Sequence, residues 1–286
     1  MQIDGKTKVI GIFGWPVEHT LSPAIHNVAF EIMGLNYVYV PFPVNPLFLY
    51  NAVFGAKALG LAGLNITIPH KQAIIEHLDE ITKLSREVGA VNTVEFRDDK
   101  IIGHNTDGIG FLQSLEMDGG IEPKDKNVLL IGAGGAARAV AFTCAENHAN
   151  SIAIMNRNQQ NAESLKTNIH QFYPKIEVTT WKLNDPKIDH LMGDFDIVIN
   201  STSLGMKSYD PIPLHPEWLN SKMIVMDLIY CPLETEFLKS AKKVGCRTVN
   251  GIGMLLYQGV AAFEIWTGVK PDIEVMKSAL EKTISQ

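Results

Sequence analysis

The sequence predicts an α/β protein built from two domains. Short runs rich in β-branched and aromatic residues alternate with helical stretches along most of the chain, which is the pattern of α/β folds. The length of 286 residues exceeds the usual size of one compact core and favours two domains over a single large one. A composition of 46% hydrophobic and 20% charged residues is that of a globular protein that can bury a core.

The first hundred residues are predicted to alternate strands and helices. Their Val, Ile, Tyr and Thr content indicates strands at residues 8–13, 36–43 and 63–68. Residues 90–96 and 100–104 flank a short polar turn and are predicted to form a hairpin. A helix is predicted to start with Ser22 as its N-cap, because proline follows at the first helical position and apolar residues then recur at helical spacing.

From Asn127 the pattern becomes a more regular succession of strand, helix and strand. Continuous apolar runs, which indicate a parallel sheet covered on both faces, occur at residues 128–131, 151–155, 195–200 and 223–228. A helix is predicted at residues 136–146, and two helices, 254–267 and 271–285, end the chain.

Charge and cysteine content argue against several classes of function. A net charge of −6 without any long Lys/Arg block gives no electrostatic reason to expect a nucleic-acid or anionic-membrane partner. The polar start, residues 1–8, does not resemble a signal peptide, and no apolar segment is long enough to span a membrane. Three widely spaced cysteines and nine histidines without ligand spacing indicate neither disulfides nor a metal site, so we expect a metal-free, cytoplasmic protein.

A glycine-rich turn follows the strand at 128–131 and opens the next helix. Gly132 permits the tight turn, Gly134 lets backbone amides approach a pyrophosphate, and Ala137 allows close helix packing. The helix N-terminus adds the positive end of a dipole. This context predicts a Rossmann-like dinucleotide-binding domain, although such a turn can also merely join a strand to a helix.

The residues after the second strand of this domain favour NADP over NAD. Where an NAD enzyme carries a carboxylate for the adenosine ribose, this chain has Asn156, Arg157 and Asn158. An arginine there can stack on adenine and pair with a 2′-phosphate. The alternative is a solvated loop arginine.

Hydride transfer involving a nicotinamide also needs a general acid or base within hydrogen-bond reach of the substrate oxygen. Strand alternation places Asn65 and Thr67 on one face, and Pro69 ends the strand just before Lys71. Lys71 is therefore a candidate, although a lysine after a strand is commonly a surface charge. Asp107 follows the hairpin at the junction of the two halves, where it either pairs with Lys71 or caps the next helix.

Further polar residues are candidates for ligand binding. Thr20 and Ser22, beside a helix N-terminus, suit a substrate carboxylate, and capping is the alternative role of Ser22. The polar turn 200–206 either faces a cofactor or simply ends a strand. Gln258 is an isolated polar residue in an apolar helix.

Taken together, these segments resemble the shikimate dehydrogenase family over essentially the whole chain. No single block is decisive, but their combination is specific. The matching blocks are residues 20–23, 65–71, 89–93, 105–108, 132–137, 156–157, 200–206, 227–230 and 251–258.

The resemblance implies a role for each candidate residue. It makes Lys71 the proton donor and acceptor, and Asp107 its acidic partner and a substrate ligand. The other implied substrate contacts are Thr20, Ser22, Asn65, Thr67, Asn92, Tyr230 and Gln258. The implied cofactor contacts are Gly132, Ala133, Gly134, Gly135, Ala136, Asn156, Arg157, Asn158, Leu228 and Gly253. Thr20 and Asn158 stand where serine and threonine are usual, and the second change alters a polar group near the 2′-phosphate.

The expected organisation is a substrate-binding and catalytic domain over residues 1–106, a Rossmann-like NADP-binding domain over 107–250, and C-terminal helices over 251–286 that return to the first domain. The expected function is the NADPH-dependent reversible reduction of 3-dehydroshikimate to shikimate in chorismate and aromatic amino acid biosynthesis. Two alternatives stay open: a quinate/shikimate dehydrogenase with relaxed cofactor use, and a non-catalytic NADP-sensing protein on the same fold. The resemblance is also compatible with a homodimer.

Overall fold

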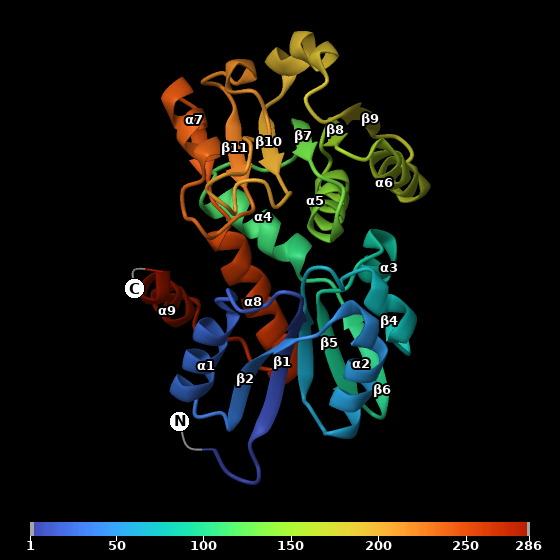
Figure 1. Ribbon diagram of the computed structural model, residues 1–286, viewed down its shortest axis with the longest axis vertical. Helices are drawn as coiled ribbons and strands as arrows, with labels where there is room; N and C mark the ends of the chain where they lie inside the picture. Colours follow the sequence, from blue (N-terminus) through green and yellow to red (C-terminus); the bar gives the residue numbers. More distant parts are fainter. Residues whose placement is uncertain (1–2, 285–286) are drawn as a thin grey trace. The chain divides into compact units, whose positions relative to one another are not determined.

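The structure, a computed structural model that describes residues 3–284, divides into two compact units. One comprises the chain up to Gly110 together with the segment from Leu256 onward, and the other is Phe111–Leu255. Each unit contains one six-stranded sheet with helices beside it (Figure 1). The α/β fold class predicted from the sequence is confirmed.

The first unit is built on a mixed sheet with the strand order β2-β1-β3-β5-β6-β4. Strand β1 lies parallel to both of its neighbours, whereas β5 runs antiparallel to β3 and β6. The strands are β1 (Lys8–Gly14), β2 (Tyr37–Pro43), β3 (Gly63–Ile66), β4 (Glu80–Ile81), β5 (Thr93–Arg97) and β6 (Lys100–His104). The helical segments are α1 (Ser22–Ile32), η1 (Pro46–Phe48), α2 (Leu49–Ala58), η2 (Ala73–His77), α3 (Lys83–Val88) and α9 (Ile273–Ile284). Helices α4 (Asp107–Met117) and α8 (Ile252–Thr267) belong partly to each unit.

The second unit has the strand order of a Rossmann-like sheet. Its parallel strands lie in the order β12-β11-β10-β7-β8-β9, so the direction of chain progression reverses between β7 and β10. In such sheets ligands bind outside the carboxyl ends of the strands, at this switch point. The strands are β7 (Asn127–Ile131), β8 (Ser151–Asn156), β9 (Glu177–Lys182), β10 (Ile197–Asn200), β11 (Ile224–Asp227) and β12 (Arg247–Val249). The helical segments are α5 (Gly135–Glu146), α6 (Gln159–Phe172), η3 (Pro186–Asp194), η4 (Pro216–Trp218) and α7 (Glu236–Val244).

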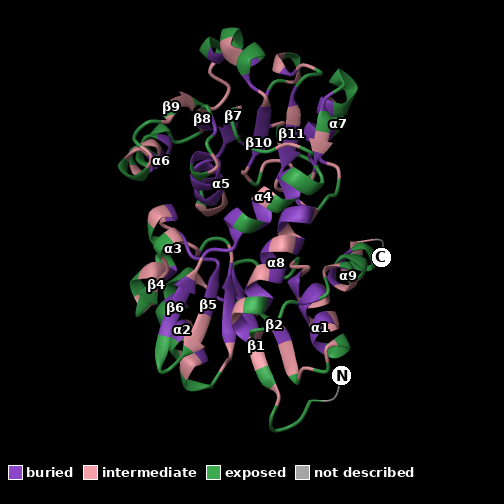
Figure 2. Ribbon diagram, turned by 180° about the vertical axis from the view of Figure 1, so that it is seen from behind, coloured by how far each residue is buried: buried purple, intermediate pink, exposed green. Residues whose placement is uncertain are grey.

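Apolar side chains of the strands and helices form the core of each unit. In the first unit, Leu64 of β3 belongs to the same buried cluster as Val53 of α2. In the second, Leu129 of β7 and Val225 of β11 cluster with Phe237 of α7. Figure 2 shows the buried residues concentrated along the strands. Because the strand interiors are filled in this way, polar groups for a ligand come mainly from strand ends and the loops that follow them.

Five strands, β2, β3, β5, β10 and β11, are shorter than the sequence predicts, and the differences at β3 and β5 concern residues near Lys71. Strand β3 ends before Thr67, although the backbone continues beside β1, where Thr67 N donates to Phe13 O at 2.9 Å. Strand β5 begins only at Thr93, because Val91 N donates to Lys71 O at 2.7 Å instead of joining the ladder. The second difference ties the backbone at Lys71 to the start of the hairpin.

The start of α1 also differs in detail from the prediction. The helix begins at Ser22 and carries proline in its first turn, as expected, but Leu21 holds the capping position and no side chain caps it. The prediction that Ser22 is the N-cap is therefore wrong, because Ser22 is already the first residue of the helix. In the predicted last helix, Ser285 lies outside the described residues.

Three findings bear on the expected class of protein. No helix within residues 3–284 is long and apolar enough to cross a membrane. Over the same part of the chain, no group of three or more His, Cys, Asp or Glu side chains is arranged to hold a metal ion. Cys144, Cys231 and Cys246 are free thiols.

Candidate functional site

A partly buried lysine and a buried aspartate form an ion pair in the first unit. Lys71 Nζ lies 2.6 Å from Asp107 Oδ2, and the two side chains are 15% and 5% exposed. Lys71 follows β3 through a turn in which His70 N donates to Thr67 O at 2.9 Å. Asp107 begins α4, and its backbone N–H donates to Asn105 Oδ1 at 3.1 Å. Of the two roles predicted for Asp107, pairing with Lys71 is the one that its side chain adopts.

Asn92 holds the second oxygen of this carboxylate. Its Nδ2 donates to Asp107 Oδ1 at 2.9 Å and to Thr106 Oγ1 at 2.9 Å, while its Oδ1 accepts from Thr106 N at 2.7 Å. Nδ2 also lies 3.4 Å from Gln258 Oε1. Because both carboxylate oxygens are engaged, Asp107 is fixed in orientation and directs Oδ2 at the lysine. A buried carboxylate needs such partners, since leaving it unpaired costs several kcal/mol.

Asn65 is oriented by a second layer of hydrogen bonds beneath this pair. Its Oδ1 accepts from Tyr39 Oη at 2.7 Å, and its Nδ2 donates to Asn92 O at 3.1 Å and to Thr93 Oγ1 at 3.2 Å. Tyr39 belongs to β2 and reaches Asn65 past the intervening strand β1. The amide group of Asn65 is therefore held in one direction by Tyr39 of β2, by the first residue of β5 and by the residue before it. Sequence analysis assigned no role to Tyr39 or Thr93, because no local pattern shows which residues of neighbouring strands face each other.

Three of the four hydroxyl residues predicted to bind substrate lie in the segments that follow β1 and β3. Thr20 Oγ1 accepts from Ser22 N at 3.3 Å, and Ser22 is 3% exposed. Thr67 packs closely on Gly14, where an added Cβ would come within 2.5 Å of Thr67 Cγ2. Since no side chain caps α1, the hydroxyl of Ser22 is not used as a helix cap.

The structure thus joins five of the nine predicted substrate residues in one hydrogen-bonded network of the first unit, namely Lys71, Asp107, Asn92, Gln258 and Asn65. Thr20 and Ser22 are bonded to each other. Tyr230 belongs to the second unit, where it is partly buried and where burial raises the pKa of its phenol.

The glycine-rich turn of the second unit has the geometry of a phosphate-binding loop. Gly132 has a φ of 116°, and a Cβ there would lie 2.4 Å from Ser201 Oγ, so no other residue fits. Gly134 precedes α5 with an extended backbone, and a Cβ on it would meet nothing within 4 Å. No side chain caps α5, so its first backbone N–H groups are not taken by a capping side chain. Open space at Gly134 and uncapped donors together fit the pyrophosphate of a dinucleotide.

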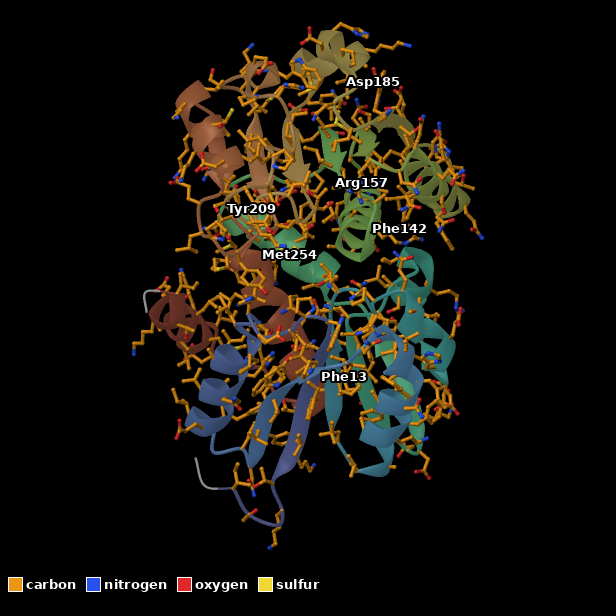
Figure 3. All side chains as sticks on the ribbon, viewed as in Figure 1. Phe13, Phe142, Arg157, Asp185, Tyr209 and Met254 are labelled. Carbon is orange, nitrogen blue, oxygen red and sulfur yellow. The ribbon has the colours of Figure 1, made fainter. Side chains whose placement is uncertain are left out.

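Arg157 lies just beyond the carboxyl end of β8 and is exposed (Figure 3). Asn156 Nδ2 donates to Asn158 O at 2.8 Å, and Asn158 Oδ1 accepts from Gln160 N at 3.0 Å, which caps α6. The segment from Asn156 to Asn161 contains no carboxylate. Its chemistry therefore fits a phosphorylated ribose better than a ribose with free hydroxyl groups.

Asp227 is a buried carboxylate to which sequence analysis assigned no role. It is 0% exposed at the end of β11, where Oδ1 accepts from Asn200 Nδ2 at 3.0 Å and from Ile229 N at 3.1 Å. Its Oδ2 accepts from Thr235 Oγ1 at 2.7 Å. Burial raises the pKa of this carboxyl to about 6, against the opposing effect of these hydrogen bonds. The network ties the ends of β10 and β11 to the start of α7 and so positions the loop that carries Leu228 and Tyr230.

The two remaining cofactor candidates differ in what surrounds them. Leu228 N donates to Asn200 O at 2.9 Å, which places Leu228 directly after β11, at the carboxyl edge of the sheet. A Cβ on Gly253 would lie 2.1 Å from Asp118 Oδ2 and 2.4 Å from Ser114 Oγ. Close packing of α8 on α4 is therefore sufficient to require glycine at residue 253.

Family models match most of the chain. A shikimate dehydrogenase substrate-binding domain matches residues 12–94, a shikimate/quinate 5-dehydrogenase domain matches 116–209, and a shikimate 5′-dehydrogenase C-terminal domain matches 251–281. The NADP(+)-dependent shikimate dehydrogenase of Methanocaldococcus jannaschii is 51% identical over 288 aligned positions, which cover 99% of this chain and 100% of that protein.

Solved structures agree with these matches. A crystal structure of a shikimate dehydrogenase in complex with NADP+ is similar with a TM-score of 0.93 and 50% identity, covering 100% of this chain and 98% of that one. Shikimate 5-dehydrogenase from Listeria monocytogenes, in complex with shikimate and NAD, has a TM-score of 0.89 and 35% identity, with 97% and 98% of the two chains covered. Sequence motifs, fold and whole-length relatives thus lead to one conclusion: the chain belongs to the shikimate dehydrogenase family.

Proposed function

We propose that this protein catalyses the reversible, NADPH-dependent reduction of 3-dehydroshikimate to shikimate, a step toward chorismate and the aromatic amino acids. The observation that carries the proposal is the ion pair of Lys71 and Asp107, whose carboxylate is fixed by Asn92. An NADP-sensing protein would have no need for an acid/base pair held in this way. The whole-length relatives named as NADP(+)-dependent shikimate dehydrogenases support the choice of substrate and cofactor.

Lys71 is the proton donor in the proposed reduction. Bound NADPH supplies the hydride that reduces the ketone carbon of the substrate. Negative charge then develops on the ketone oxygen, and the ammonium group of Lys71 transfers a proton to it. In the reverse direction, neutral Lys71 accepts the proton of the hydroxyl group.

Asp107 positions the lysine during this transfer. Its Oδ2 accepts a hydrogen bond from Lys71 Nζ at 2.6 Å, while Asn92 keeps Oδ1 in place at 2.9 Å. Because the folded protein already holds the proton donor in place, the entropic cost of orienting it is not part of the barrier to proton transfer. We further propose that Asp107 contacts the substrate hydroxyl group.

The other substrate contacts follow from the chemistry of the ligand. The hydroxyls of Thr20 and Ser22, beside the uncapped start of α1, bind the substrate carboxylate. The ring hydroxyls are bound by the remaining polar set, which comprises Asn65, Thr67, Asn92, Tyr230 and Gln258.

The cofactor is proposed to bind the second unit. The loop from Gly132 to Ala136 accepts the pyrophosphate, and residues 156–158 accept the adenosine ribose with its 2′-phosphate. Leu228 and Gly253 contact the remainder of the dinucleotide. The corresponding domain assignment, 1–106, 107–250 and 251–286, together with a homodimer and a cytoplasmic location, stays a prediction.

A Lys71→Ala variant tests the acid/base assignment. We expect its turnover of NADPH with 3-dehydroshikimate to fall about 100- to 10,000-fold, because general acid catalysis contributes about that factor. Equilibrium binding of NADPH should stay unchanged, since Lys71 belongs to the other unit. Lys83→Ala, which removes an equally charged lysine whose side chain is 91% exposed, is the matched control and should keep full activity.

The same assay separates the proposed function from its alternatives. Turnover with NADPH and 3-dehydroshikimate but not with NADH or 3-dehydroquinate supports the proposal. Comparable use of the second pair supports a quinate/shikimate dehydrogenase, and NADPH binding without any turnover supports a sensing protein. Wild-type rates in Lys71→Ala would remove Lys71 from the acid/base role.

A further inference from the structure

The cofactor site proposed above holds fewer positive charges than its ligand requires. A phosphate monoester such as the 2′-phosphate of NADP carries about −1.5 to −2 charges near neutral pH. Arg157 supplies one positive charge, and the side-chain oxygen of Asn158 is already used to cap α6 through Gln160 N at 3.0 Å. A second cation near Arg157 would complete the neutralisation of the dianion.

The register of strands β8 and β9 places Lys182 beside this segment. Lys182, the last residue of β9, is paired with Asn156, the last residue of β8. The two chains stay together beyond the strands, because Leu183 N donates to Asn156 O at 3.1 Å. Paired residues in adjacent strands lie about 5 Å apart and point to the same face of the sheet. Lys182 thus flanks the residue that immediately precedes Arg157.

Thr180, two residues before Lys182 in β9, shows on which face of the sheet Lys182 lies. Thr180 Oγ1 donates to Glu163 Oε1 of α6, so the side chain of Thr180 lies on the α6 face of the sheet. Residues two apart in a strand share a face, which places Lys182 on the α6 side as well. Figure 1 shows α6 next to β8 and β9. Lys182 therefore stands at the carboxyl edge of the sheet, the edge at which α6 begins with its cap Asn158.

Both cations are free to meet a ligand. Arg157 and Lys182 are exposed, and neither takes part in an ion pair with any residue from 3 to 284. The nearest carboxylates along these segments have other partners. Glu163 Oε1 accepts a hydrogen bond from Thr180 of β9, and Asp185 Oδ1 accepts one from Lys187 N at 3.0 Å.

We infer that Lys182 is a specificity-determining residue, which contacts the 2′-phosphate of NADP(H) together with Arg157. Arg157 offers a planar fork that suits two phosphate oxygens, whereas Lys182 adds a compact charge on a flexible stem. The contact distinguishes NADP from NAD because NAD has a hydroxyl group at this position. The inference rests on the proposed function, since it takes NADP as the cofactor.

The test is equilibrium binding measured by calorimetry on the full chain, without any reaction. The probes are NADP+, NAD+ and adenosine 2′,5′-bisphosphate, which carries the 2′-phosphate without the nicotinamide. Lys182→Ala is compared with Lys175→Ala, which removes the same charge from an exposed site before the opposite end of β9. Both variants change the net charge equally, so a difference between them reports a local contact.

Lys182→Ala should bind NADP+ and adenosine 2′,5′-bisphosphate about 10-fold more weakly than Lys175→Ala does, because a charge-assisted contact to phosphate is lost. Binding of NAD+ should be equal in the two variants. Lys182→Arg should recover most of the lost affinity, and the difference should shrink as salt screens the charges.

Two results would overturn the inference while leaving the proposed function intact. One is equal affinity of Lys182→Ala and Lys175→Ala for NADP+, and the other is an equal loss of NADP+ and NAD+ binding in Lys182→Ala. Failure of the wild-type protein to bind NADP+ would instead remove the proposed function, and the inference with it.

Discussion

Replacing Asp227 with asparagine should remove a pH dependence from the stability of the second unit. The pKa of the Asp227 carboxyl is raised by burial from 3.8 to about 6 in the folded protein. The folded state therefore holds the proton more tightly than the unfolded chain, and stability falls as the pH rises from about 4 to about 6. Above that range the folded protein carries an ionised carboxylate whose hydrogen-bond partners, among residues 3–284, are the neutral donors Asn200, Ile229 and Thr235.

The size of the effect follows from the shift. A difference of about two pH units, at 1.36 kcal/mol each, makes the wild-type protein about 3 kcal/mol less stable above pH 6 than at acid pH. No discount for solvent screening applies, because Asp227 is 0% exposed. About half of the loss should occur between pH 5 and pH 8.

Asparagine has the same shape as aspartate and can keep three of the contacts at this site. Its Oδ1 can accept from Asn200 Nδ2 and Ile229 N as the aspartate does now, and its Nδ2 can donate to Thr235 Oγ1 once that hydroxyl turns. Because asparagine does not titrate, residue 227 of the Asp227→Asn variant should contribute no pH dependence to the free energy of unfolding over this range.

Urea denaturation of the wild-type and variant proteins at several pH values measures this difference. The contributions of other titrating groups cancel when the free energy of unfolding of the variant is subtracted from that of the wild type at each pH. The exposed Asp189→Asn in the same unit is the control and should show a constant difference. A constant difference for Asp227→Asn as well would refute the raised pKa, and a difference of opposite sign would mean that the hydrogen bonds outweigh burial.

Two further predictions concern burial and the glycine loop. His26 is 0% exposed and burial lowers its pKa to about 3, so wild-type stability should fall as the pH drops below 6.5, by about 1.4 kcal/mol per pH unit. His26→Leu should lose less stability in acid than the wild type, measured by chemical denaturation at matched pH values; equal losses would contradict the lowered pKa. Gly134→Ala should keep the melting temperature within a few degrees but weaken NADP+ binding about 10-fold or more, because its Cβ meets open space that we assign to the pyrophosphate. Gly132→Ala should lower the melting temperature itself, since its φ of 116° disfavours any side chain. Unchanged NADP+ binding in Gly134→Ala would contradict the pyrophosphate assignment.

The fold class could be predicted from sequence because its determinants are local. Residues 128–131 form a run that is apolar along its whole length. Such a run indicates a parallel strand covered on both faces even before its neighbouring strands are known. The left-handed turn at Gly132 likewise depends on one residue and its place between strand and helix. These signals suffice for a Rossmann-like unit, and the observed strand order confirms it.

The site could be predicted only in part, because its contacts depend on register between distant segments. The pairing of Lys71 with Asp107 spans 36 residues, and sequence chemistry alone left capping as an equal alternative for Asp107. The bond from Tyr39 to Asn65 depends on the order of β2, β1 and β3, which no local pattern shows. Ser22 misled in the opposite direction, since a serine before proline is a common cap but here already belongs to the helix.

Two buried carboxylates, Asp107 and Asp227, illustrate how surroundings assign different tasks to the same group. Asp107 and Asp227 are 3% and 0% exposed, and both accept a hydrogen bond from an asparagine. Asp107 also faces the cation Lys71, so its charge is balanced and it can hold the lysine that we propose as the proton donor. Asp227 faces only neutral donors among the hydrogen bonds that the described residues make to it. No cation among these partners balances its charge. Asp227 can therefore order the loops after β10 and β11, whereas a carboxylate that assists proton transfer needs a cation to keep it ionised.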